Sequence, residues 1–261
     1  MMMPRSLFSK TVYQKRKFML GWFIGLMAMT ILTLSFFPSF KNGALGQALT
    51  NLSPAAKKIV GNVDSFKTIG GYIGQQLFAL RIPLLSTILG IVLFSGLTVG
   101  EERKGLLETQ LSLPISRLKI LTHKLLAGIL IMAIASIGVF VGVVIALFFL
   151  REHYSLLNVL QEIAGALLVS LCFGLIAFML GAVFGKKGMA VGAASGFAFL
   201  SYLISSLVAS VPSLRGIEKA SLFHYQSPPI ISPPHVLVLG SVALILIAIS
   251  LVPFSRRDIG V

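Results

Sequence analysis

The residue types that most often do chemistry are sparse in this sequence and do not cluster. Its 261 residues include eight Asp and Glu, four His and a single Cys. Nowhere do they take the spacing of a metal site, and no serine lies in a Gly-x-Ser-x-Gly turn. The one cysteine, Cys172, is expected to be a small buried apolar residue. We therefore expect neither a catalytic residue nor a metal site in this chain.

One glycine-containing segment superficially resembles a phosphate-binding loop. In Gly181–Lys187 (GAVFGKK), three residues separate the glycines instead of four, and a lysine stands where Ser or Thr would bind magnesium. The segment is better explained as a short turn between two helices. If the protein does ATP-driven work, ATP and magnesium must be bound by a partner subunit.

The composition indicates a membrane protein. Hydrophobic residues make up 56% of the chain and charged residues 11%, whereas soluble domains carry about 25% charged residues. The net charge of +14 would suggest a nucleic-acid partner in a soluble protein. Here the basic residues flank apolar segments, so contact with membrane lipids explains them and we expect no nucleic acid.

Six uncharged segments are long enough to cross a bilayer, which takes about 20 helical residues. They are continuously apolar, which excludes a β-barrel, and backbone groups in lipid must pair within a helix. We therefore predict an all-α membrane protein with one transmembrane domain over residues 1–261. The predicted spans are 18–37, 83–100, 125–150, 163–185, 188–211 and 236–254.

The distribution of positive charge predicts the orientation. Four segments, 1–17, 101–124, 186–187 and 255–261, hold 14 of the 22 Lys and Arg residues. Segments rich in Lys and Arg stay in the cytoplasm, so both termini should be cytoplasmic in a plasma-membrane protein. Apolar residues alternate with lysines before the first span, which fits either an interfacial helix or a frayed basic tail.

Ionisable residues are expected to be absent from the membrane interior. All eight acidic residues lie outside the predicted spans. Proton- and ion-driven carriers usually place such a residue within the bilayer, so a gradient-driven carrier is disfavoured. An uncharged interior also predicts an apolar or amphipathic cargo rather than a bare ion.

The fifth span carries a stripe of serines. Ser201 and Ser205 are four residues apart and share a helix face, and Ser206 follows directly. The stripe is a candidate translocation path. The alternative is hydrogen bonding between packed helices, a common role of serine in membrane bundles.

The loop between the second and third spans, Glu101–Lys124, is the most informative soluble segment. Leu107 and Leu111 lie four apart on one face of a predicted short helix, with Leu106 beside them. Pro114 fits the first turn of a second helix. Such a charged, leucine-faced element could dock a soluble subunit, or it could be a solvated loop whose leucines rest on lipid headgroups.

This loop and two later segments resemble type-2 ABC-transporter permeases. The motifs that carry the resemblance occur in the family's order: Gly100–Glu108 (GEERKGLLE), Leu113–Arg117 (LPISR), Lys124–Ala127 (KLLA), Ser221–Tyr225 (SLFHY) and Phe254–Ile259 (FSRRDI). The length, the helix count and the orientation agree as well.

The resemblance implies a coupling helix that docks on a separate nucleotide-binding ATPase subunit. It also implies an interfacial N-terminal helix, two copies of the ATPase, and a second permease copy or a paralogue. The residues expected at the docking site are Glu101, Glu102, Arg103, Gly105, Leu106, Leu107, Glu108, Leu111, Pro114 and Arg117.

The sequence thus favours the membrane subunit of an ATP-driven exporter that is not itself an enzyme. Two alternatives remain open at this stage. The first is a membrane sensor or assembly subunit that uses the same ATPase without moving cargo. The second is the gradient-driven carrier.

Overall fold

The computed structural model describes residues 6–41, 43, 63–102, 116–208, 211–226 and 232–256. These residues form helices and turns, with no β-strand among them, so the predicted all-α class is confirmed. Six helical segments are long and apolar enough to cross a membrane. They are α2–α3 (Arg16–Ser35 and Phe37–Lys41), α6–η2–α7 (Ile69–Tyr72, Ile73–Arg81 and Ile82–Leu97), α10 (Arg117–Leu150), α11 (Leu156–Phe184), α12 (Lys187–Leu207) and α13 (Pro233–Arg256).

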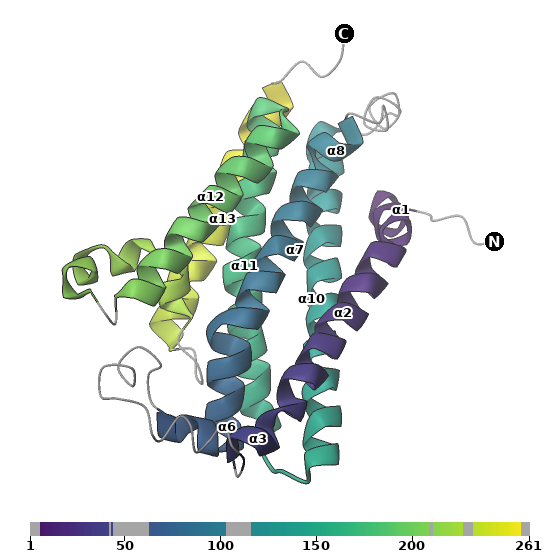
Figure 1. The fold of residues 1–261 in the computed structure, drawn as a ribbon. Coiled ribbons are helices and arrows are strands. Elements are labelled where there is room, and N and C mark those ends of the chain that lie inside the picture. Colours follow the sequence, from purple (N-terminus) through teal and green to yellow (C-terminus); the bar gives the residue numbers. More distant parts are fainter. Residues whose placement is uncertain are drawn as a thin grey trace.

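The six segments run roughly alongside one another, with short elements at the two ends of the bundle (Figure 1). One end, here the α8 end, carries α1 and α8. The opposite end, here the α6 end, carries α3, α6 and η1, and three 3-10 turns connect α12 to α13 on that side of the chain. The short elements are α1 (Leu7–Gln14), η1 (Val63–Lys67), α8 (Val99–Glu102), η3 (Pro212–Gly216), η4 (Glu218–Ala220) and η5 (Leu222–Tyr225).

The second membrane-length segment starts at Ile69, well before the predicted Pro83. The added part contains the π-helix η2, in which each hydrogen bond joins residues five apart instead of the four of an α-helix. Pro83 lies two residues after the end of η2; it has no N–H to donate, and its ring crowds the carbonyl four residues earlier. A search for uncharged segments missed this extension because the charged residue Arg81 lies in η2.

The expectation that every acidic residue lies outside the spans is wrong for Glu162. This residue lies in the first turns of α11, within a membrane-length helix, and is 3% exposed. Its carboxylate accepts a hydrogen bond from the hydroxyl of Tyr154 at 3.3 Å. Burial against protein, instead of contact with lipid, makes the position tolerable.

Close helix contacts in the core depend on glycines. A Cβ added to Gly138 of α10 would lie 2.3 Å from the carbonyl oxygen of Phe23 in α2, and one on Gly142 would lie 2.9 Å from that of Met27. Gly174 of α11 similarly packs on Gly90 of α7. Small residues let the backbones of membrane helices approach, which is the main source of packing energy where lipid competes with apolar side chains.

Helix α12 is packed on one face only. Ala190, Ala194, Ala198 and Ser201 are buried, whereas a Cβ added to Gly188, Gly192 or Gly196 would have no neighbour within 4 Å. The glycines of α10 thus pack inside the chain, and those of α12 face away from it.

Candidate functional site

The predicted docking element lies at the α8 end. Glu101 and Glu102 close the short helix α8, and Arg117 opens α10. The rest of the predicted docking set lies outside the described residues: Arg103, Gly105, Leu106, Leu107, Glu108, Leu111 and Pro114. The docking assignment therefore stays a prediction.

Both helices that flank this loop are anchored in the bundle. At the end of α7, the Thr98 hydroxyl donates to the carbonyl of Phe94 at 3.2 Å, and Thr98 packs directly against Gly181 of α11. At the start of α10, Ser116 caps the helix by accepting from the N–H of Lys119 at 3.4 Å. Leu121 and Lys124 are each 1% exposed. The described residues on both sides of the loop are thus packed into the bundle.

The N-terminal segment does form a helix. Ser6 caps α1 through the N–H of Ser9 at 3.2 Å, and the Arg16 guanidinium lies 3.8 Å from the ring centre of Tyr13. Helix α1 packs on α10 and, more lightly, on α2. Its location at the membrane interface stays a prediction.

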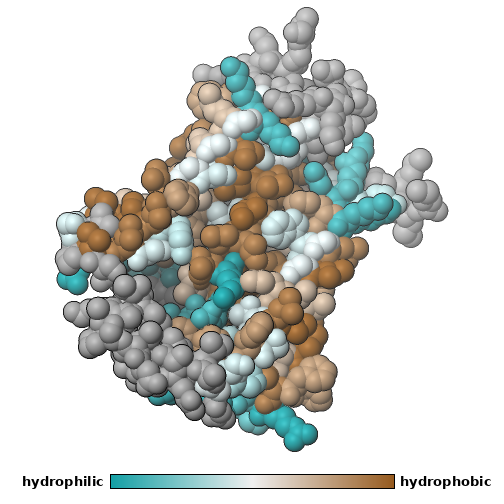
Figure 2. All heavy atoms as spheres, in the orientation of Figure 1, coloured by the Kyte–Doolittle hydropathy of each residue, from teal (hydrophilic) through white to brown (hydrophobic). Residues whose placement is uncertain are grey.

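A second region, at the α6 side, contains a cavity of about 780 Å³ that we call the polar cavity. Figure 2 shows a hydrophilic patch in the lower half of the view, between hydrophobic surfaces of the helices. Four parts of the chain that lie far apart in the sequence line the cavity: η1, the η2–α7 helix, α12 and the turns η4–η5. Its polar lining residues are Gln75, Gln76, Arg81, Ser205, Ser206, Glu218, His224 and Gln226.

The π-helix supplies the cation of this cavity. Nη1 of Arg81 donates to both the main-chain carbonyl and the side-chain oxygen of Gln76, one turn earlier. Arg81 forms no ion pair with any carboxylate of the described residues. Gln76 and Arg81 also border a smaller cavity of about 260 Å³ on the α2 side. Among the described residues, the guanidinium is therefore held in place by the uncharged oxygens of Gln76.

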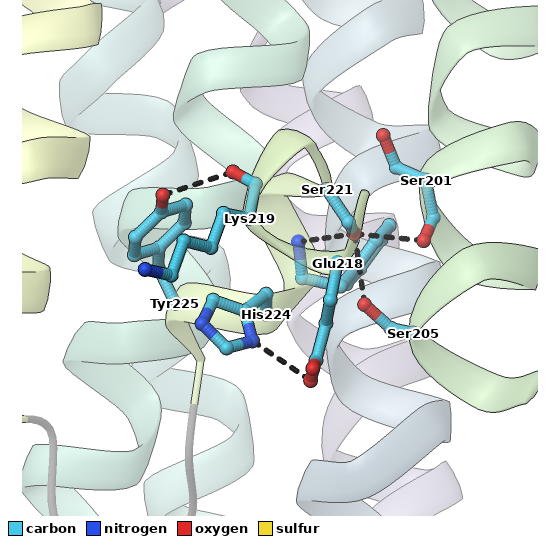
Figure 3. A network of polar contacts seen from close by, with 8 residues as sticks. Ser201, Ser205, Glu218, Lys219, Ser221, His224 and Tyr225 are labelled. Carbon is cyan, nitrogen blue, oxygen red and sulfur yellow. Dashed lines mark hydrogen bonds and ion pairs between the residues drawn. The ribbon is translucent and has the colours of Figure 1, made fainter. Parts of the chain in front are cut away.

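A hydrogen-bond network centred on Ser221 holds the turns η4–η5 against α12 (Figure 3). The Ser221 hydroxyl donates to the carbonyl of Ser201 at 2.7 Å and lies 2.8 Å from the hydroxyl of Ser205. It also accepts from the N–H of Phe223 at 3.2 Å. Ser221 is fully buried, so these three bonds fix the wall of the cavity.

The carboxylate of the cavity is paired within the same wall. Nδ1 of His224 lies 2.9 Å from Glu218, as Figure 3 shows. The Tyr225 hydroxyl donates to the carbonyl of Lys219 at 2.9 Å, and the ring of His235 packs edge-on against Tyr225. These contacts connect η4 to η5 and pack η5 against the start of α13.

An apolar pocket of about 180 Å³ adjoins the polar cavity, since Tyr202 and Phe223 line both. Along α7 it extends away from Arg81 towards the α8 end. Thr87 is a polar residue in its wall that is 4% exposed, and its hydroxyl has no hydrogen-bond partner among the described residues. The other lining residues are Leu84, Ile88, Ile91, Ser195, Ala198 and Phe199.

The structure separates the three serines that the sequence grouped as a candidate path. Ser205 and Ser206 line the polar cavity, whereas Ser201 is buried behind it and its carbonyl accepts the bond from Ser221. The stripe thus contributes both to a cavity wall and to hydrogen bonding between elements. Transport along it stays a prediction.

Sequence reasoning missed Arg81, Glu218 and His224 as site residues. The sequence signal that could have revealed the cavity was the Gln75-Gln76 pair, followed by Arg81, within an otherwise apolar stretch. Within the described parts of the chain, no three His, Cys, Asp or Glu side chains gather as metal ligands. The Cys172 thiol is buried and lies 3.5 Å from the carbonyl of Leu239.

Comparison with known protein families gives a match over nearly the whole chain. Residues 7–259 match the family described as ABC-2 family transporter protein. The match covers α1 and all six membrane-length segments. No curated protein matches the sequence.

Proposed function

Because the chain belongs to the ABC-2 family of transporter proteins, we propose that it exports an amphipathic cargo with energy from ATP hydrolysed by a separate subunit. The chain is a multi-pass protein of the cell membrane and a membrane subunit of an ABC transporter. The cargo, the direction and the partner chains are the parts that we propose. The earlier resemblance, based on loop motifs, is confirmed by the family match.

The adjoining polar cavity and apolar pocket carry this proposal. A cavity of about 780 Å³ with eight polar lining residues meets a pocket of about 180 Å³ with an almost wholly apolar wall. Binding sites of this kind combine an apolar surface with a few polar groups that set orientation. Such a pair suits a molecule with one polar and one apolar part better than it suits a bare ion.

Energy would enter at the α8 end through the loop 103–115 and its flanking residues Glu101, Glu102 and Arg117. We propose that the leucines of this loop dock in a cleft of one ATPase subunit. The corresponding loop of the second permease subunit would dock on a second ATPase subunit. Exposed ion pairs add only about 0–1 kcal/mol each, so the leucine face should provide most of the binding energy. A second copy of this chain, or a paralogue, would complete the transporter.

The proposal is tested with the purified chain and its ATPase subunit in liposomes. ATP hydrolysis and cargo movement are measured with and without single-chain amphiphiles. Amphiphile-stimulated hydrolysis with movement across the bilayer supports the exporter. Hydrolysis without movement would favour the sensor subunit, and movement without nucleotide would favour the gradient-driven carrier.

A further inference from the structure

We propose that the polar cavity binds the anionic headgroup of a lipid-like amphiphile at Arg81, while its hydrocarbon chain occupies the apolar pocket beside Thr87. This inference rests on the proposed function and names the chemical class of the cargo. The shared chemistry is a phosphate-type or carboxylate-type anion, and the tests below separate a lipid headgroup from a free anion.

Arg81 supplies the binding group. It lies within a membrane-length helix, where an ionisable residue is costly and usually functional. Glu218 lines the same cavity, yet it pairs with His224 and not with Arg81. One guanidinium carries five N–H donors, and the two bonds to Gln76 use only Nη1. The remaining donors suit a planar or tetrahedral anion that accepts two bonds at once.

The apolar pocket fits one hydrocarbon chain. An apolar cavity of about 150 Å³ holds one benzene molecule, so a pocket of about 180 Å³ accommodates roughly six or seven carbon atoms of a single chain. Its walls come from α7, α12 and Phe223 of η5, and the shared residues Tyr202 and Phe223 place its mouth at the cavity. A molecule with two chains would leave the second one outside.

Thr87 indicates where the junction between the headgroup and the hydrocarbon chain of the bound molecule lies. Its hydroxyl is buried without a partner among the described residues, in the wall of a pocket that is mostly apolar. Buried hydroxyls are normally bonded, so this one calls for an acceptor from a ligand. Thr87 follows Arg81 by six residues, or about 9 Å along a helix. An ester carbonyl linking a charged headgroup to an acyl chain would meet this donor.

The test uses the full chain in detergent and a lysophosphatidic acid that carries a 12-carbon acyl chain with a diazirine on its sixth carbon, within the length that the apolar pocket accommodates. After illumination, mass spectrometry should find the label on the segments of α7 and α12 that line the apolar pocket. We expect Arg81→Gln to reduce labelling at least tenfold and Arg81→Lys to reduce it less. Arg215→Gln, an exposed arginine in η3, is the matched control and should leave labelling unchanged.

Competition separates the possible anions. Unlabelled dodecyl phosphate should displace the probe, whereas dodecyltrimethylammonium and inorganic phosphate should not. Equal displacement by the cationic detergent would show that headgroup charge is irrelevant and would overturn the inference. Displacement by inorganic phosphate at the same concentration would show a free-anion site and would overturn the lipid assignment.

Three further variants test the position of the bound molecule. Ser206→Trp narrows the polar cavity and should block labelling, whereas Leu32→Trp narrows the cavity on the α2 side and should not; the reverse result would move the headgroup and contradict the inference. Thr87→Val should weaken binding of the ester probe several-fold but leave the matching ether probe unchanged. Equal effects on both probes would remove Thr87 from the site.

Amphiphile-stimulated ATP hydrolysis in the same Arg81 variants keeps this inference separate from the proposed function. Stimulation that persists when labelling is lost would leave the exporter intact and place its cargo elsewhere. Loss of both follows if the cargo binds at Arg81.

Discussion

At the scale of single residues, the Ser221 hydroxyl makes three hydrogen bonds that hold η5 against α12. It connects η5 to α12 at two positions and closes its own turn. Removal of a buried hydroxyl that satisfies several partners costs about 1–3 kcal/mol, because those partners lose their bonds in a site without water.

We therefore expect Ser221→Ala to lower the unfolding temperature by several degrees in detergent. Ser206→Ala is the control, since Ser206 is exposed to the same cavity and outside this network. The midpoint of thermal unfolding measures both. Equal midpoints for the two variants would show that the network does not hold the wall.

Tyr154 provides a pH-dependent prediction at the same scale. Burial, together with the smaller effect of the nearby Glu162 carboxylate, raises the pKa of Tyr154 to about 12. Between pH 10 and 12 the unfolded chain loses the tyrosine proton while the folded chain keeps it, so folding stability falls as the pH rises. Below pH 9 both states keep the proton and no such dependence is expected.

Unfolding temperatures at pH 8 and pH 10.5 test this. Other groups also titrate in the range, so the comparison is with Tyr154→Phe, which should lose less stability over the same interval. Parallel curves for the two proteins would mean that Tyr154 does not contribute to the alkaline dependence.

At the scale of elements, the close contact of α2 and α10 has a direct test. We expect Gly138→Ala to lower the unfolding temperature, because the added Cβ would lie 2.3 Å from a backbone oxygen that cannot move without shifting α2. Overpacking of this kind typically costs about 1–3 kcal/mol.

Gly21→Ala in α2 is the matched control. A Cβ there has nothing within 4 Å inside the chain, so its effect on the isolated chain should be small. A Gly138→Ala protein as stable as the Gly21→Ala protein would contradict the packing that the structure describes.

The loop at the α8 end is tested by uncoupling. We expect Leu107→Asp or Glu101→Lys to abolish amphiphile-stimulated ATP hydrolysis while basal hydrolysis by the ATPase subunit continues. The reason is that a charge on the leucine face, or a reversed charge beside it, removes the docking contact. Full stimulated turnover in these variants would show that docking occurs elsewhere.

The extent of sequence-based prediction also follows from particular elements. Six helices could be predicted because lipid requires continuous apolar residues and internal backbone bonding. The extension of α7 through η2 could not be predicted in the same way, since Gln75, Gln76 and Arg81 face a cavity and not lipid. The polar cavity combines residues from four separate segments, and only tertiary packing brings them together. For Glu162, a charge near a span end gave no indication that it would be buried.

At the scale of the whole molecule, the charge distribution predicts that the α8 end is cytoplasmic. Cys172 is the only cysteine and is buried, so one surface position at a time can be given a reactive thiol in a Cys172→Ala background. Ser116 lies at the α8 end and Ser213 in η3, and both are exposed.

We expect a membrane-impermeant maleimide to label Ser213→Cys in intact cells and to label Ser116→Cys only after the membrane is opened. This result would follow from the excess of Lys and Arg at the α8 end. Labelling of Ser116→Cys from outside would reverse the orientation and place the docking loop away from any cytoplasmic ATPase.

The nine-residue π-helix has a mechanical consequence for the whole chain. Its i→i+5 bonds hold more residues in each turn than the α-helix that continues it. Conversion of this stretch to α geometry would lengthen it and rotate α6 about the axis of α7 while the main chain stays hydrogen-bonded. A change of winding in one helix can therefore couple axial movement to rotation without any hinge.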